Sequence, residues 1–94
     1  MPVIGVLTLE LRIEHAQSLK DKRQVVKSLK DRLRGRFNVA VAEIEGTETW
    51  QRSVIAVVTV SADRLFAGQI LQAAEEDAAH LLGPILVQAG TEWL

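Results

Sequence analysis

The sequence predicts an α+β protein in which four strands form one antiparallel sheet and two helices cover one face of it. Two observations predict this fold class. Apolar residues recur at every second position in some segments and at every third or fourth in others, in the order strand, helix, strand, strand, helix, strand. The chain has 94 residues, which is enough for one core and too short for two of ordinary size. We therefore expect a single domain over residues 1–94.

The first strand is expected from Val3 to Glu14, because every second residue between Leu7 and Ile13 is apolar. A helix should follow, since Ser18 can cap the first free N–H groups and Asp21 suits the positive end of a helix. We expect this helix to end near Gly35, where glycine offers a left-handed exit. Its apolar positions fall at helical spacing, at Leu19, Val25, Val26, Leu29 and Leu33.

The middle of the chain predicts a hairpin. Phe37 to Ile44 and Arg52 to Val60 have strand patterns, and the polar residues 45–49 leave room only for a short link, so the two strands should be antiparallel. Both faces of the second of these strands are largely apolar, so one of them must lie away from the helices. That face and the unpaired backbone of the edge strands make a second copy of the chain, in a homodimer, a candidate partner.

The second helix should begin at a cap, Ser61 or Asp63, and stop at Gly83 and Pro84. Its expected apolar positions are Phe66, Ile70, Ala74, Ala78 and Leu81. Residues 85–94 supply a weaker last strand. Right-handed crossovers turn this order into a ferredoxin-like βαββαβ sandwich, with both helices on one face of a four-stranded antiparallel sheet.

The composition excludes several classes of protein. Hydrophobic residues make up 48% and charged residues 24%, as in a folded globule. The chain has no cysteine, which removes disulfides, thiolate nucleophiles and cysteine-based zinc sites. No apolar run is long enough to span a membrane, and the first residues lack the basic start and cleavage site of a signal peptide, so we expect a cytoplasmic protein.

Positive charge is concentrated in the first helix. Residues 18–36 hold eight basic and two acidic residues, a net +6, although the whole chain has a net charge of -1. Five of these basic residues fall within about 80° of one another around the helix, over a length of roughly 21 Å. They are Lys20, Arg23, Lys27, Lys30 and Arg34, and we call them the basic flank. Such a row can neutralise several phosphates of a nucleic acid.

Three more residues are candidates to extend this binding surface. We expect Arg36 and Arg52 to enlarge the positive patch and Trp50 to add one stacking contact with a base. Lys22 differs from the others, because it points into the apolar arc of the helix. There its stem can pack while its ammonium group reaches outward.

The charge pattern leaves other interpretations open. The basic flank can be neutralised within the protein by acidic residues of the second helix, namely Glu75, Glu76 and Asp77. It can also meet an acidic protein instead of RNA. Trp50, in turn, can be a lid over the open end of the core rather than a stacking surface.

Residues that carry catalysis are sparse. His15 in a loop and His80 near the end of the second helix make no metal motif, and there is no Gly-rich phosphate loop or nucleophile elbow. We therefore expect no enzymatic activity, cofactor, metal or small-molecule substrate. The first and third strands lack the aromatic residues with which an RNA-recognition sheet stacks bases, and we expect Phe66 in the core. Sequence-specific reading of single strands is therefore not expected.

A family resemblance is carried by five segments: Ser18-Leu19-Lys20-Asp21-Lys22-Arg23, Val25-Val26-Lys27-Ser28-Leu29, Arg32-Leu33-Arg34, Arg36-Phe37-Asn38-Val39 and Trp50-Gln51-Arg52-Ser53. They resemble the YlxP-like family of small bacterial proteins, over roughly residues 3–61. The resemblance implies a ferredoxin-like fold. It also implies an RNA-linked role, because genes of this family tend to lie among those for translation factors and ribosome maturation. The family's function is unknown, and it supplies no catalytic residues to carry over.

These observations together predict a small accessory protein of translation or the ribosome, which binds structured RNA or a ribosomal particle through the basic flank. The contacts would be to the phosphate backbone, so affinity should fall steeply with salt. The alternative is a non-enzymatic protein-interaction or self-assembly module, in which the basic flank meets an acidic surface.

Overall fold

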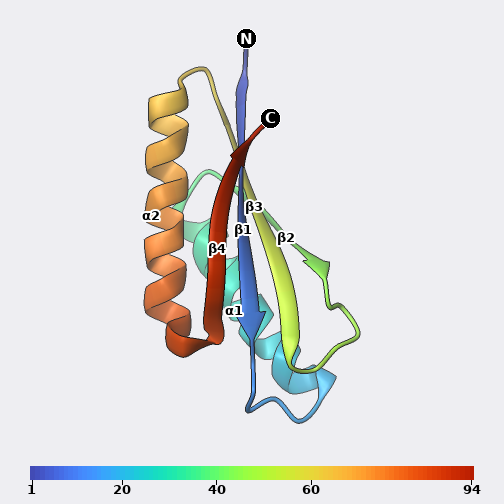
Figure 1. Ribbon diagram of the computed structural model, residues 1–94. Helices are drawn as coiled ribbons and strands as arrows, with labels where there is room; N and C mark the ends of the chain where they lie inside the picture. The colour runs from blue at the N-terminus through green and yellow to red at the C-terminus, as the bar shows by residue number, and fades with distance from the viewer.

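The computed structural model describes residues 1–94. The elements are β1 (Val3–Arg12), α1 (Leu19–Arg36), β2 (Ala40–Glu45), β3 (Arg52–Ser61), α2 (Arg64–Leu82), a 3-10 turn (Gly83–Ile85) and β4 (Leu86–Trp93). The four strands form one antiparallel sheet in the order β2-β3-β1-β4, and both helices cover one face of it (Figure 1). The expected ferredoxin-like order and topology are confirmed, and the other face of the sheet is open.

The sheet side of the core is formed mainly by apolar residues at every second position of the two central strands, β1 and β3. The four apolar residues from Leu7 to Ile13 are fully buried beneath the helices, as are Ile55 and Val57 of β3. The helices contribute Leu29, Leu33 and Leu71 to the same cluster. Each such side chain stabilises the fold by about 1.5–3 kcal/mol on burial.

Helix α1 begins and ends close to where the sequence predicts, but without the expected left-handed exit. The Ser18 hydroxyl accepts a hydrogen bond from the Asp21 N–H at 3.1 Å, and the Asp21 carboxylate accepts one from the Gln17 N–H at 3.0 Å. Gly35 does not end the helix, because the chain keeps a helical backbone through Arg36 and no left-handed residue occurs there. The Phe37 N–H then closes the last turn on the Leu33 carbonyl at 3.0 Å.

Helix α2 is capped by Asp63, whose carboxylate accepts a hydrogen bond from the Phe66 N–H at 3.1 Å. Of its five expected apolar positions, Ala74 and Ala78 are confirmed, and the other three are each displaced by one residue. Phe66 is 54% exposed and not in the core, and the buried positions are Ala67, Leu71, Ala74, Ala78 and Leu82. Three alanines on this face let the helix pack closely on the sheet, and a bulky side chain would hold it away.

Three strands are shorter than predicted, and the first of them, β1, ends at Arg12 and not at Glu14. Strand β2 starts at Ala40 because residues 37–39 make a tight turn, in which the Val39 N–H reaches the Phe37 carbonyl at 3.0 Å. Strand β4 starts at Leu86 because Pro84 belongs to the 3-10 turn that leaves α2. Both chain ends lie at the same end of the elongated molecule, which measures 44 × 22 × 21 Å (Figure 1). Neither helix has an apolar stretch of the length needed to cross a membrane.

Candidate nucleic-acid interface

Helix α1 carries cations on two sides, and the side that faces α2 is neutralised. Asp77 of α2 accepts two hydrogen bonds from the Arg32 guanidinium, at 2.9 and 3.0 Å, and one from Arg36 at 3.1 Å. The hydrogen bond from Arg32 holds the pKa of Asp77 below its ordinary value, with the charges of Arg32 and Arg36 acting in the same direction. This three-residue cluster fastens the two helices to each other.

The basic flank lies on the other side of α1, toward β2. Between the helix and this edge strand is a shallow hollow of about 390 Å³, and Glu43 is the residue of β2 that lines it. Four of the five residues of the basic flank line the hollow, namely Arg23, Lys27, Lys30 and Arg34. The helical spacing in the sequence thus brings these cations together on one surface.

Two carboxylates, Asp31 and Glu43, line the same hollow as the basic flank, but the one salt bridge that either forms with the flank is that of Asp31 with Lys27. Lys20, Arg23 and Lys30 have no carboxylate oxygen within the 4.0 Å of a salt bridge. Lys27 pairs with Asp31 at 2.6 Å, but both side chains are more than half exposed, so the pair is weak. Its hydrogen bond lowers the pKa of Asp31. Arg34 donates to the Val41 carbonyl at 2.7 Å and forms no salt bridge.

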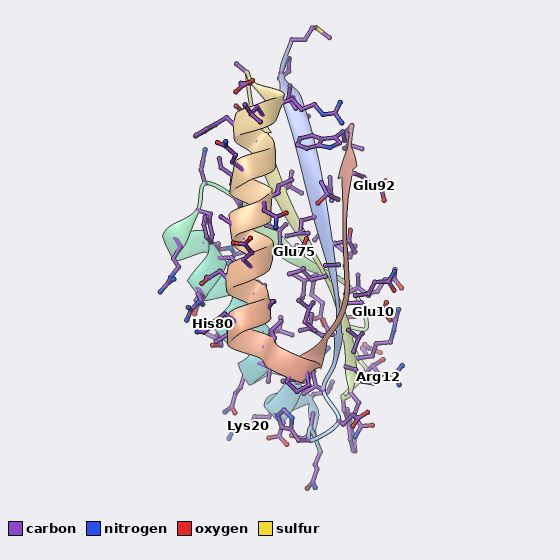
Figure 2. The ribbon with its side chains drawn as sticks, turned by 60° about the vertical axis from the view of Figure 1, so that its left-hand side comes forward. Glu10, Arg12, Lys20, Glu75, His80 and Glu92 are labelled. Atoms are coloured by element: carbon purple, nitrogen blue, oxygen red, sulfur yellow. The ribbon has the colours of Figure 1, made fainter.

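Acidic residues of α2 do not pair with the basic flank. Asp77 reaches only Arg32 and Arg36, on the other side of α1. Glu75 and Glu76 form no salt bridge at all. Figure 2 shows Glu75 partway along α2, while Lys20 lies toward the opposite end of the molecule from the chain termini. Neutralisation from the second helix, the first of the open interpretations, is therefore not what the structure shows.

Two of the expected extensions of the patch lie elsewhere. Arg36 is paired with Asp77, as described above. Arg52 lies on the open face of the sheet, because its neighbour Ser53 points into the core and successive strand residues alternate. There its guanidinium is 3.8 Å from Glu10 and 3.5 Å from Glu45. Neither arginine enlarges the basic flank.

Lys22 joins α1 to the β2–β3 hairpin. Its side chain is fully buried, and its ammonium group donates to Glu43 Oε2 at 2.7 Å and to the Gly46 carbonyl at 2.5 Å. Ser53 donates to the same carboxylate oxygen at 2.5 Å. The expectation that this ammonium group reaches outward is wrong, because it meets partners under the hairpin. Sequence reasoning missed this cluster, for which the signals were a lysine in an apolar arc and an inward-facing serine in β3.

The loop that carries Trp50 is held at both of its ends. Gly46 has a φ of 78°, and a Cβ there would lie 2.6 Å from the Arg52 carbonyl oxygen, so only glycine fits. At the other end Gln51 donates to the carbonyls of Glu14 and Ala16, at 3.1 and 3.2 Å. Trp50 itself is 51% exposed, which fits a contact surface better than a lid over the core.

Comparison with known proteins identifies the family. The sequence pattern of the family described as "Protein of unknown function (DUF503)" matches residues 4–82, and the chain belongs to that family. The uncharacterized protein YlxP of Bacillus subtilis (strain 168) is 39% identical over 70 residues, which cover 74% of this chain and 76% of YlxP. The resemblance seen in the sequence is confirmed.

Solved structures share the fold. A dimeric ferredoxin-like protein of unknown function from Thermobifida fusca YX has a TM-score of 0.51 and 13% identity, covering 97% of this chain and 90% of that one. A C-terminal segment of the alpha subunit of aIF2 from Pyrococcus abyssi has a TM-score of 0.56 and 14% identity, covering 99% of this chain and 49% of that one. At such identities the likeness shows the ferredoxin-like fold alone.

Proposed function

We propose that this protein binds structured RNA through the basic flank of α1. One observation carries the proposal: five cations share one side of a helix, and three of them, Lys20, Arg23 and Lys30, form no salt bridge within the protein. Like charges at helical spacing oppose helix formation by about 0.2–0.5 kcal/mol per pair, and an anionic ligand removes that repulsion. The family resemblance favours ribosomal RNA as the class of ligand and the cytoplasm as the place of action.

The binding mode is contact with phosphates and not reading of bases. Each phosphate neutralised by a lysine or arginine releases counterions, so the contacts supply affinity without sequence information. The open face of the sheet offers no aromatic side chain from β1 or β3 on which bases could stack. Trp50 is the one half-exposed aromatic beside the hairpin, and we assign it a single stacking contact. This role requires no catalysis and no cofactor.

The proposal is tested by titrating labelled structured RNA with nuclease-treated protein across a series of salt concentrations. The test variant replaces the three unpaired cations, Lys20, Arg23 and Lys30, by glutamine. We expect its slope of log affinity against log salt to be shallower by about 1 for each phosphate contact that is lost.

A matched control removes the same charge from other surfaces. Replacing Arg12, Arg36 and Arg52 by glutamine also takes away three cations, none of them on the basic flank. The control should keep the slope of the unaltered protein. Absence of binding at low salt, or an equal loss of slope in the control, would overturn the proposal, and an acidic protein partner would then be sought with the same variants.

Self-assembly is the second candidate function. The observation in this chain that favours it is the uncovered edge of β4, a row of eight residues with no strand beyond it.

A further inference from the structure

The two edges of the sheet present different backbone groups to solvent. In an antiparallel ladder, hydrogen-bonded pairs alternate with pairs that face away. The Leu94 N–H donates to the Ile4 carbonyl at 2.9 Å, so this residue pair is a hydrogen-bonded one. Counting back along β4 from Leu94, every second residue is then hydrogen-bonded to β1, and the residues between them face away from β1. The N–H and C=O groups of Ala89, Thr91 and Trp93 therefore point away from β1. We call this row the β4 edge.

The opposite edge, on β2, is protected. By the same alternation the Val41 carbonyl points away from β3, and the Arg34 guanidinium occupies it at 2.7 Å. Strand β2 has only six residues, and its pairing is irregular between Glu43 and Glu45, both of which are charged. A short strand, a bulge, charged residues and a covering side chain are the devices by which proteins block strand addition.

The β4 edge has less protection: the one irregularity in its pairing with β1 lies near the start of β4, between Leu86 and Gln88, and the ladder is regular from Gln88 to Trp93. Strand β4 has eight residues, and Glu92 is the only charged one among them. No side chain donates to or accepts from the outward groups of Ala89, Thr91 or Trp93. Unpaired edges of this kind bind an added strand through their backbone groups.

We propose that the β4 edge pairs with the β4 edge of a second copy of this chain, antiparallel and about a two-fold axis, so that two four-stranded sheets become one continuous sheet. The inference deepens self-assembly, the second candidate function, and is independent of RNA binding. A second copy is the fitting occupant because pairing of β4 with the β2 edge is blocked, whereas β4 with β4 closes after two chains.

The sequence of β4 is compatible with pairing to itself. With the two-fold axis at Gly90, Thr91 lies opposite the partner's Ala89, and Glu92 lies opposite the partner's Gln88. No like charges are then directly opposed, which would be destabilising. Gly90 has no atom within 4 Å of the position of a Cβ, so the centre of the pairing is free of obstruction.

The side of α2 next to the β4 edge is also suited to a second copy. Gly68 and Arg64 lie against the ring of Trp93, which places this side of the helix beside β4. An open hollow of about 490 Å³ runs along it from Arg64 to Glu76. The two-fold axis makes the second α2 run in the opposite direction. The Arg64 end of each hollow is therefore turned toward the Glu76 end of the other, and these two residues have opposite charges.

The first measurement is the mass of the purified chain by light scattering over a range of concentrations. We expect it to rise from the 10.4 kDa of one chain toward twice that value. The variant Gly90→Lys places a cation at the centre of the pairing, in open space on the sheet face away from the helices. It should weaken dimerisation by about tenfold or more, because two lysines then oppose each other. The matched control is Ala42→Lys, at an exposed position of β2, which should leave dimerisation unchanged.

Hydrogen exchange of single amides distinguishes this interface from any other. In the dimer the amides of Ala89, Thr91 and Trp93 should exchange about tenfold or more slowly than in Gly90→Lys. A mass that stays at one chain at all concentrations would overturn self-assembly, whatever the outcome with RNA. A dimer that persists in Gly90→Lys with these amides unprotected would overturn the β4 edge as its interface while leaving self-assembly standing.

Discussion

At the scale of single residues, the most informative one is Lys22. A fully buried ammonium group is costly to remove from water, and here it is compensated by Glu43 and the Gly46 carbonyl. The cluster joins one residue of a helix to a hairpin that lies more than twenty residues further along the chain. Its value to the protein is therefore in orienting the hairpin, and so the exposed Trp50, relative to α1.

The substitution Lys22→Met should lower the free energy of unfolding by about 3 kcal/mol or more, since it leaves the Glu43 carboxylate largely buried without its cation. Urea denaturation measures this directly. Replacing the exposed Lys20 by methionine serves as the control and should change stability by less than about 0.5 kcal/mol. A loss in Lys22→Met no larger than that of the control would show that the buried pair does not hold the hairpin.

Asp77 makes the stability of the fold depend on pH in the acid range. Its pKa is depressed in the folded state, chiefly by the hydrogen bond from Arg32, so its contribution to stability is present above the unfolded pKa of about 3.8. That contribution is lost as the pH falls through the folded pKa. We expect Asp77→Asn to lower stability at neutral pH and to flatten the acid limb of a plot of unfolding free energy against pH. An acid limb identical to that of the unaltered protein would contradict this assignment.

At the scale of elements, the cations of α1 lie on two sides of the helix and have different roles. The side facing α2 is used inside the protein, where Arg32 and Arg36 share Asp77. The side facing β2 is left with charge that no acidic residue of α2 balances. The β2–β3 hairpin lies beside this second side, and its turn depends on one glycine.

The variant Gly46→Ala should destabilise the protein by about 1–3 kcal/mol, because alanine is strained at a positive φ and its Cβ would meet the Arg52 carbonyl oxygen. Thermal unfolding of Gly35→Ala is the matched comparison. Gly35 is helical, with nothing within 4 Å of its Cβ position, so alanine should stabilise α1 by roughly 0.5–1 kcal/mol. Equal behaviour of the two variants would refute the role given to the Gly46 turn.

At the scale of the whole molecule, the sequence predicted the fold well because both periodicities are clear. Alternation from Leu7 to Ile13 and the serine cap at Ser18 mark β1 and the start of α1, and the structure confirms both. On α2 the prediction was right at Ala74 and Ala78 and one residue off at the other three positions, because adjacent apolar residues such as Ile70 and Leu71 fit the helical spacing about equally well.

The candidate site was predictable only in part. Helical spacing was sufficient to gather the basic flank, since its residues belong to one element. Two facts depend on tertiary contacts that no local pattern contains: the destination of the Lys22 ammonium group, and the pairing of Asp77 with Arg32 and not with the basic flank. For the same reason the difference between the β2 and β4 edges becomes visible only when Arg34 is seen on the Val41 carbonyl.

The strand order has a consequence for how the chain is made. Strand β1 precedes both of its neighbours in the chain, since it lies between β3 and β4, so it has no partner in the sheet until β3 has been synthesised. Its second neighbour, β4, follows only after α2. Closing the sheet therefore requires contacts between segments far apart in the sequence, such as Leu94 with Ile4, and these are entropically slow to form. During synthesis one side of β1 stays open until β4 has been made, and in that interval the nascent chain is most exposed to mispairing with its neighbours.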